Sequence, residues 1–179
     1  AIERLAQLPL LVEAKGAAIV AEGHYQNMKE GPEASMVAQV AEVEVDRETG
    51  EVKIKKVTTA HNTGTVVNPL GHQGQIDGGV VMGMGQARME EVVIDDSGKV
   101  ATANLGDYKI PTIRDIPELK TAITELPAGS GPYHSMSIGE TAIMPIAAAI
   151  ANAVEDAVGV RIKEMPITAE KVLAALKAK

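Results

Sequence analysis

The sequence predicts a fold of the α+β class, in which a mixed sheet packs against helices. Residues 36–46 alternate in the period of two that is typical of a half-buried strand, and residues 52–55 resume this alternation at the start of a second strand that runs to about Thr59. Residues 139–158 and 169–177 instead have the apolar spacing of helices. Because these elements do not follow one another in regular βαβ units, a doubly wound parallel sheet is not expected.

Size and composition limit the class of protein. The 179 residues fit one domain or two small lobes, which we would place at about 1–65 and 66–179. Aromatic residues make up 2%, with no Phe or Trp, so we expect an aliphatic core and no stacking on nucleic-acid bases. The formal net charge of −7 also argues against nucleic acid or an anionic membrane as the main partner.

The chain contains no Cys, which excludes disulfides, iron–sulfur clusters and thiolate metal sites from these residues. No apolar run reaches the roughly 18 residues of a membrane span, and no leader pattern is present, so a cytoplasmic location is the default. The sequence begins with Ala, and residues 2–8 have the pattern of the middle of a helix without a cap. We therefore expect a fragment of a longer protein.

The first half of the chain is predicted to contain mainly strands. Residues 16–26 have the composition of one strand, and residues 36–46 and 52–59 form a hairpin around the turn sequence Asp46-Arg47-Glu48-Thr49-Gly50.

A glycine-rich helix is predicted to follow, with Asn68 as its N-cap and Pro69 at its first position, and to end near Glu91. Six Gly lie between positions 71 and 85, and each costs a free helix about 1 kcal/mol relative to Ala. Such a helix needs something packed closely against it. Two interpretations stay open: Gln75, Gly78 and Gly79 contact a heterocycle or phosphate, or the small residues allow tight packing within the fold.

The second half predicts a short strand at 92–94, an irregular segment at 107–112, a strand at 119–126 and a loop at 127–137. A helix over 139–158 and a last helix over 169–177, capped by Thr168, complete the chain.

Glu140 is the leading candidate for chemistry. It lies in Ser137-Ile138-Gly139-Glu140, directly before the apolar residues of the predicted 139–158 helix. Desolvation there would raise the pKa of the carboxyl, and the helix dipole would lower it. The simpler alternative is an acid in the first turn that stabilises the helix.

Other catalytic patterns are missing from the sequence. The four His, at 24, 61, 72 and 134, lack the spacing of metal ligands, so no metal site built from protein ligands alone is expected. The sequence also has no Walker motif, no dinucleotide-binding fingerprint and no G-x-S-x-G elbow.

Four segments in order resemble the C-terminal part of the molybdopterin-binding subunit of the xanthine dehydrogenase and aldehyde oxidase family. They are Asn62-Thr63-Gly64 with Asn68-Pro69; Gly74-Gln75-Ile76-Asp77-Gly78-Gly79 with Gly83-Met84-Gly85; Asp107-Tyr108-Lys109-Ile110-Pro111-Thr112 with Asp115-Ile116-Pro117-Glu118; and Ile138-Gly139-Glu140 with the Ala-rich stretch 147–154 and Gly159-Val160-Arg161. The resemblance extends from about residue 17 to near the end of the chain.

The resemblance implies roles for particular residues. Glu140 matches the family's general base beside the molybdenum centre, and Gln75 matches the Gln that hydrogen-bonds the pterin. Gly78, Gly79, Ser137 and Gly139 would complete the cofactor contacts. The implied activity is a molybdenum-dependent hydroxylase that oxidises an aldehyde or N-heterocycle with oxygen derived from water.

The resemblance also implies partners: the N-terminal half of the molybdopterin subunit, and iron–sulfur and flavin domains or subunits. The isolated fragment is then expected to be inactive. The sequence departs from the family at Met136-Ser137, where Lys-Gly is common, and at Asn62, where Asp is common. A non-catalytic assembly module that keeps the fold is the alternative.

Overall fold

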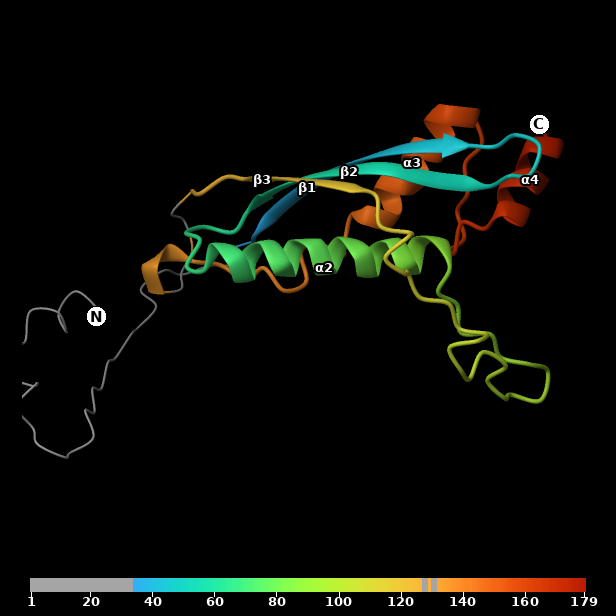
Figure 1. The fold of residues 1–179 in the computed structure, drawn as a ribbon, viewed down its shortest axis with the longest axis horizontal. Coiled ribbons are helices and arrows are strands. Elements are labelled where there is room, and N and C mark those ends of the chain that lie inside the picture. Colours follow the sequence, from blue (N-terminus) through green and yellow to red (C-terminus); the bar gives the residue numbers. More distant parts are fainter. Residues whose placement is uncertain (1–33, 127–128, 130–131) are drawn as a thin grey trace, which may run out of the picture. The chain divides into compact units, whose positions relative to one another are not determined.

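The computed structural model describes residues 34–126, 129 and 132–179. The helix predicted at 2–8 and the strand predicted at 16–26 lie outside these residues. Along the described chain the elements are β1 (Met36–Val45), β2 (Val52–Asn62), α2 (Pro69–Arg88), β3 (Glu118–Ile123), the 3-10 turn η2 (Pro132–His134), α3 (Ile146–Val158) and α4 (Ala169–Lys177). The predicted α+β class is confirmed (Figure 1).

The sheet has three strands in the order β1-β2-β3 and is mixed. β1 and β2 form the predicted antiparallel hairpin, whereas β3 pairs parallel with β2 after the chain has passed through α2 and residues 89–117. The sheet thus joins residues on both sides of position 65. The division into two lobes stays a prediction.

The hairpin turn is stabilised locally and at its tip. The Asp46 carboxylate accepts hydrogen bonds from the backbone N–H groups of Glu48 and Thr49, at 2.8 and 3.1 Å. Gly50 has φ of +78°, a left-handed conformation that side chains rarely adopt, and it lies against Ala169 and Leu173 of α4. The tip of the hairpin therefore packs on the last helix.

A β-bulge in β2 shifts by one residue which side chains of that strand face the helices. Glu42 pairs with Lys56 but Val43 pairs with Ile54, so Lys55 is the extra residue. Because of this insertion, Ile54 and Val57 both point to the covered face, although they are three residues apart. The remaining positions follow the period of two that the sequence predicts.

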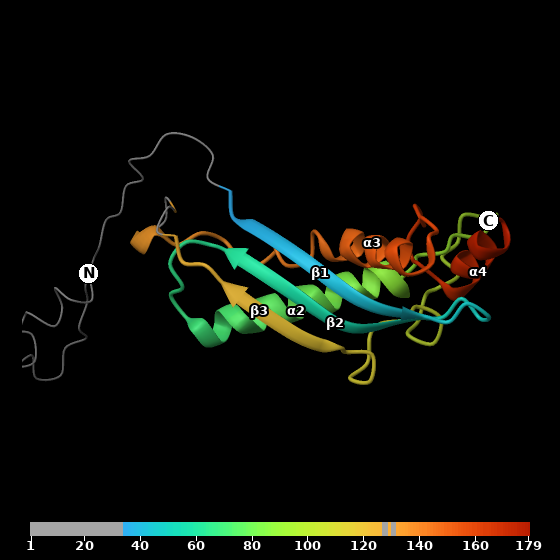
Figure 2. The same ribbon diagram turned by 90° about the horizontal axis from the view of Figure 1, so that it is seen from above.

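Helices α2 and α3 cover that face, while the opposite face of the sheet is exposed (Figures 1 and 2). The core between the layers is aliphatic, as the composition predicts. Its fully buried side chains include Val57, Ile76, Val80, Ile146, Ile150, Val154, Ile167 and Val172.

Two helix boundaries differ from the predicted ones. α2 ends at Arg88 rather than near Glu91, because the Ala87 carbonyl, which would accept from the Glu91 N–H, accepts from Ile167 N at 2.7 Å. α3 begins at Ile146 rather than at Gly139, since Pro145 disfavours helical backbone at the preceding residue and cannot donate to the turn before it. The predicted N-cap at Asn68 and the whole of α4 with its Thr168 cap are confirmed.

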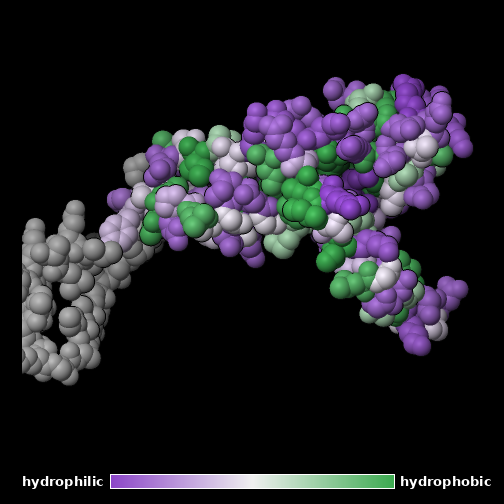
Figure 3. Space-filling model, viewed as in Figure 1, coloured by the Kyte–Doolittle hydropathy of each residue, from purple (hydrophilic) through white to green (hydrophobic). Residues whose placement is uncertain are grey.

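The segment between α2 and β3 is irregular. The strand predicted at 92–94 is reduced to one isolated bridge between Ile94 and Val100, and the strand predicted at 119–126 is β3, which is shorter. Figure 3 shows apolar side chains mixed with polar ones over this segment. Its exposed apolar side chains include Val92, Val93, Ile94, Leu105, Ile110 and Ile113.

Candidate functional site

Two of the predicted site segments meet in the fold. α2 presents Gln75 on its exposed side, and the turn at residues 139–140 lies beside it. A Cβ built on Gly139 would lie 3.8 Å from Oε1 of Gln75, which is ordinary van der Waals contact. The carboxamide of Gln75 and the backbone next to Glu140 therefore belong to one surface.

The glycines of α2 divide into an open group and a packed group. Gly74 and Gly78, one turn apart, have nothing within 4 Å of a built Cβ. A Cβ on Gly79 would come within 2.7 Å of the Ala142 Cβ, and one on Gly83 would overlap the Ile146 side chain. The packing interpretation therefore applies to Gly79 and Gly83, whereas Gly74 and Gly78 leave open space beside Gln75, and ligand contact there stays a prediction.

The segment that carries Ser137, Gly139 and Glu140 is fixed at both ends. Before it, Met136 N donates to the Thr63 carbonyl at 2.8 Å. After it, the Gln39 side chain of β1 donates through Nε2 to the Ala142 carbonyl, also at 2.8 Å. Ser137, Gly139 and Glu140 themselves are exposed.

Glu140 does not begin a buried helix, which corrects the sequence prediction. It lies in a turn six residues before α3, for the reason that Pro145 supplies. Its carboxylate is therefore held by the turn and not by a helix dipole, and the residue is exposed, as Gln75 is.

The loop before Glu140 contains two consecutive non-glycine residues in left-handed backbone, Tyr133 with φ of 62° and His134 with φ of 61°. The carbonyl of His134 accepts from Thr65 N at 3.1 Å, which ties this conformation to the end of β2. Both side chains are exposed. Such backbone is uncommon and clusters at functional sites.

Several buried polar side chains lie close together on and near the covered face of the sheet. His61 and Thr59 are 1% and 3% exposed, and His61 Nε2 lies 2.7 Å from Thr59 Oγ1. His72 of α2 lies 3.3 Å from Thr63 Oγ1. Burial lowers the pKa of both histidines. Across the described part of the chain, no three His, Asp or Glu side chains cluster as a metal site would require.

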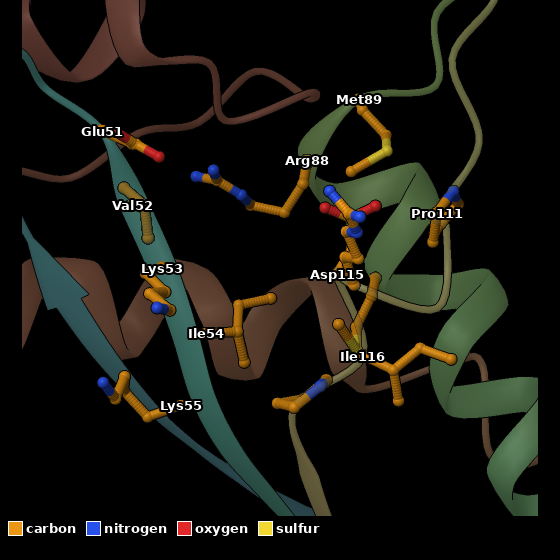
Figure 4. Close-up of a pocket in the computed structure, with 13 residues that line it drawn as sticks. Glu51, Val52, Lys53, Ile54, Lys55, Arg88, Met89, Pro111, Asp115 and Ile116 are labelled. Carbon is orange, nitrogen blue, oxygen red and sulfur yellow. The ribbon is translucent and has the colours of Figure 1, made fainter.

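A pocket lies away from this surface, at the C-terminal end of α2. It has a volume of about 420 Å³ and is lined by β2, the end of α2 and residues 111–117 (Figure 4). Arg88 extends into it toward Glu51 and donates to the Ile167 carbonyl at 3.1 Å. Burial lowers the pKa of Arg88, and the charge of Glu51 opposes that shift. None of the predicted site residues lines this pocket.

The comparison with protein families decides which kind of domain this is. The model of the molybdopterin cofactor-binding domain matches residues 2–117. This chain belongs to that family. Within the described residues no helix is long and apolar enough to cross a membrane.

Similar sequences include subunits of two dehydrogenases. The chain is 43% identical over 128 residues to a putative xanthine dehydrogenase molybdenum-binding subunit of Escherichia coli K12, covering 71% of the chain and 17% of that protein. It is also 43% identical over 143 residues to one of the subunits of nicotinate dehydrogenase from Pseudomonas putida, covering 80% of the chain and 12% of that protein.

Solved structures agree with the fold. Quinoline 2-oxidoreductase from Pseudomonas putida 86 matches 76% of the chain with a TM-score of 0.73 and 34% identity. Aldehyde oxidoreductase from Desulfovibrio gigas matches 80% with a TM-score of 0.73 and 35% identity. The chain spans 18% and 15% of those two chains, so it corresponds to under a fifth of the proteins that it resembles.

Sequence reasoning missed the residues that hold the site in place. Gln39 is the one long polar side chain at the inward positions of β1, which otherwise carry Val or Ala. That irregularity was a usable signal, because a polar group on a covered face needs a hydrogen-bond partner. Nothing in the local sequence pointed to its partner, the carbonyl of Ala142.

Proposed function

We propose that this chain supplies the general base and part of the cofactor cradle of a molybdenum hydroxylase that oxidises an aldehyde or an N-heterocycle. The observation that carries the proposal is the proximity of Gln75 to Gly139, the residue before Glu140. The space beside Gly74 and Gly78 on the same helix is open. These residues come from two segments that family resemblance connects with the cofactor.

The open side of α2 fits a flat polar ring. Without side chains at Gly74 and Gly78, a ligand can approach the helix backbone closely. Gln75 offers both a donor and an acceptor, which suits the mixed hydrogen-bonding edge of a pterin. Gly79 contributes indirectly, since its lack of a side chain lets Ala142 and the Glu140 turn lie against α2.

Molybdopterin would supply the metal centre at which the substrate is oxidised with oxygen derived from water. Glu140 would accept the proton released in that step. A general base works best with a pKa near the working pH. The carboxylate is exposed here, and the rest of a longer protein would cover it and exclude water from the site.

The rest of the enzyme would come from other residues. Because the chain spans a fifth or less of these relatives and contains no Cys, iron–sulfur clusters would sit on other domains or subunits, as would a flavin. The names of the relatives, which include xanthine, nicotinate and aldehyde enzymes, support the two substrate classes without choosing between them.

The decisive experiment is Glu140→Gln in the complete enzyme. The expected result is a fall in turnover of about 10²–10⁴-fold, the usual contribution of a general base, with molybdenum content unchanged. Turnover and molybdenum content are measured on the same preparation. The variant that tests the cradle is Gln75→Ala, for which we expect a lower molybdenum content.

Gln86→Ala is the matched control, since Gln86 is also an exposed Gln of α2 and lies about three turns away. Near-normal turnover of Glu140→Gln would rule out the general base. An unchanged molybdenum content in Gln75→Ala, together with active Glu140→Gln, would instead favour a non-catalytic assembly module.

A further inference from the structure

We infer that Gln39 is a positioning residue for Glu140, an inference that rests on the proposed function. Gln39 lies on β1, far from the predicted site in sequence, and its Nε2 donates to the Ala142 carbonyl at 2.8 Å. Ala142 is fully buried and follows Glu140 by two residues. A displacement of this carbonyl would move the backbone that carries the catalytic carboxylate.

The turn has few other supports on that side. Ile143 N reaches the Glu140 carbonyl only at 3.4 Å, and Thr141 donates to the Ile138 carbonyl at 3.1 Å, so both of these bonds are internal to the turn. The bond from Gln39 ties the turn to the sheet. Contact of Ala142 with Gly79 ties it to α2, but an apolar contact does not fix the orientation of a peptide group.

The Gln39 carboxamide is itself held in a polar environment. It lies opposite Thr59 in the β1–β2 register, next to His61 on the covered face. Its Oε1 is buried without a hydrogen-bond partner, and so is Nδ1 of His61. Buried polar atoms rarely stay unpaired, so the unpaired Oε1 carries a cost in stability at this position. The bond that the carboxamide does make is the donation from Nε2 to the Ala142 carbonyl.

The geometry explains why a side chain without a donor cannot replace Gln39. A residue of the same length but apolar, such as Met, would fill the space and leave the Ala142 carbonyl buried and unpaired. The peptide group would then turn toward another donor or toward solvent. Misplacement by about 1 Å of a reacting group can cost a factor of about 10² in rate.

The test is Gln39→Met in the complete enzyme, alone and combined with Glu140→Gln, with Gln86→Met as the matched control on an exposed surface. We expect Gln39→Met to lower kcat by about 10–100-fold while KM and molybdenum content stay near normal. In the Glu140→Gln background the same change should lower the residual rate no further, because the residue acts through Glu140. Equal losses in both backgrounds would overturn the inference.

Hydrogen exchange gives a second readout that does not depend on turnover. Amides of residues 137–143 should exchange faster in Gln39→Met than in Gln86→Met, since the anchor on the sheet is lost. If Glu140→Gln proves active, the proposed base fails, and this exchange alone decides whether Gln39 positions the turn; unchanged protection would refute it. Gln39→Asn, which keeps the carboxamide but shortens its reach, replaces the Met variant if that protein does not fold.

Discussion

The two halves of α2 use the same residue type for opposite purposes. In the first half, Gly74 and Gly78 face open space beside Gln75. In the second half, Gly83 lies against Ile146 of α3, and Gly85 lies against Glu90 and Pro111. Absence of a side chain therefore leaves open space beside Gln75 at one end of the helix and allows close packing of the fold at the other. A glycine-rich sequence does not distinguish the two, but the neighbours of each residue do.

The largest effect is expected from Gly83→Ala. The new methyl group would overlap the fully buried Ile146 side chain, and overpacking of this kind costs about 1–3 kcal/mol even where Ala favours the helix. Thermal unfolding of the complete protein measures the change. A variant as stable as the parent protein would mean that α2 and α3 can separate without cost.

The matched change in the open half, Gly78→Ala, should have the opposite sign for stability. Ala replaces Gly in a helix interior with nothing within 4 Å, so a gain of about 0.5–1 kcal/mol is expected. If this face receives the cofactor, the same variant should contain less molybdenum. Lower stability would contradict the open space around Gly78. An unchanged molybdenum content would contradict the proposal that the cofactor lies against this face.

The smallest effect is expected in the pH dependence of stability, through the buried side of the first half of α2. His72 belongs to that half but points into the protein, near His61. Because burial lowers the pKa of both histidines in the folded state, the unfolded chain binds protons more readily, and stability should fall as pH drops below 6.5. Unfolding midpoints between about pH 7 and pH 5 measure this decline.

The replacement His61→Gln should make that decline shallower, because it removes one of the two protonation sites. The carboxylates with lowered pKa values, such as Asp46, titrate at lower pH and do not contribute in this range. An identical pH dependence with and without His61 would show that its burial has no energetic consequence.

Local signals were sufficient for much of the fold. Asn68 followed by Pro69, the alternation along β1 and β2, and Thr168 before α4 each predict an element because the interactions concerned lie within a few residues. The start of α3 was predicted wrongly although its cause, Pro145, was visible in the sequence. The Ala-rich composition favours a helix over the whole segment, but Pro145 alone decides where that helix can begin.

The arrangement of the site could be predicted only in part. Resemblance connected Gln75 with Glu140, but their proximity depends on how α2 packs against the turn, which no local pattern encodes. The same holds for the division between Gly78 and Gly79, adjacent residues with different neighbours. Long-range contacts of this kind require the assembled fold.

The bond between Gln39 and Ala142 spans 103 positions of the chain, and this has a consequence for biosynthesis. A ribosome completes β1, β2 and α2, including Gln75 and Gly78, well before residue 142 exists. Until then the backbone that follows Glu140 lacks its bond to β1, so this support of the turn forms only after residue 142 has been synthesised. A product that is terminated before residue 142 would therefore contain Gln75 and Gly78 without the bond that holds the Glu140 turn to the sheet.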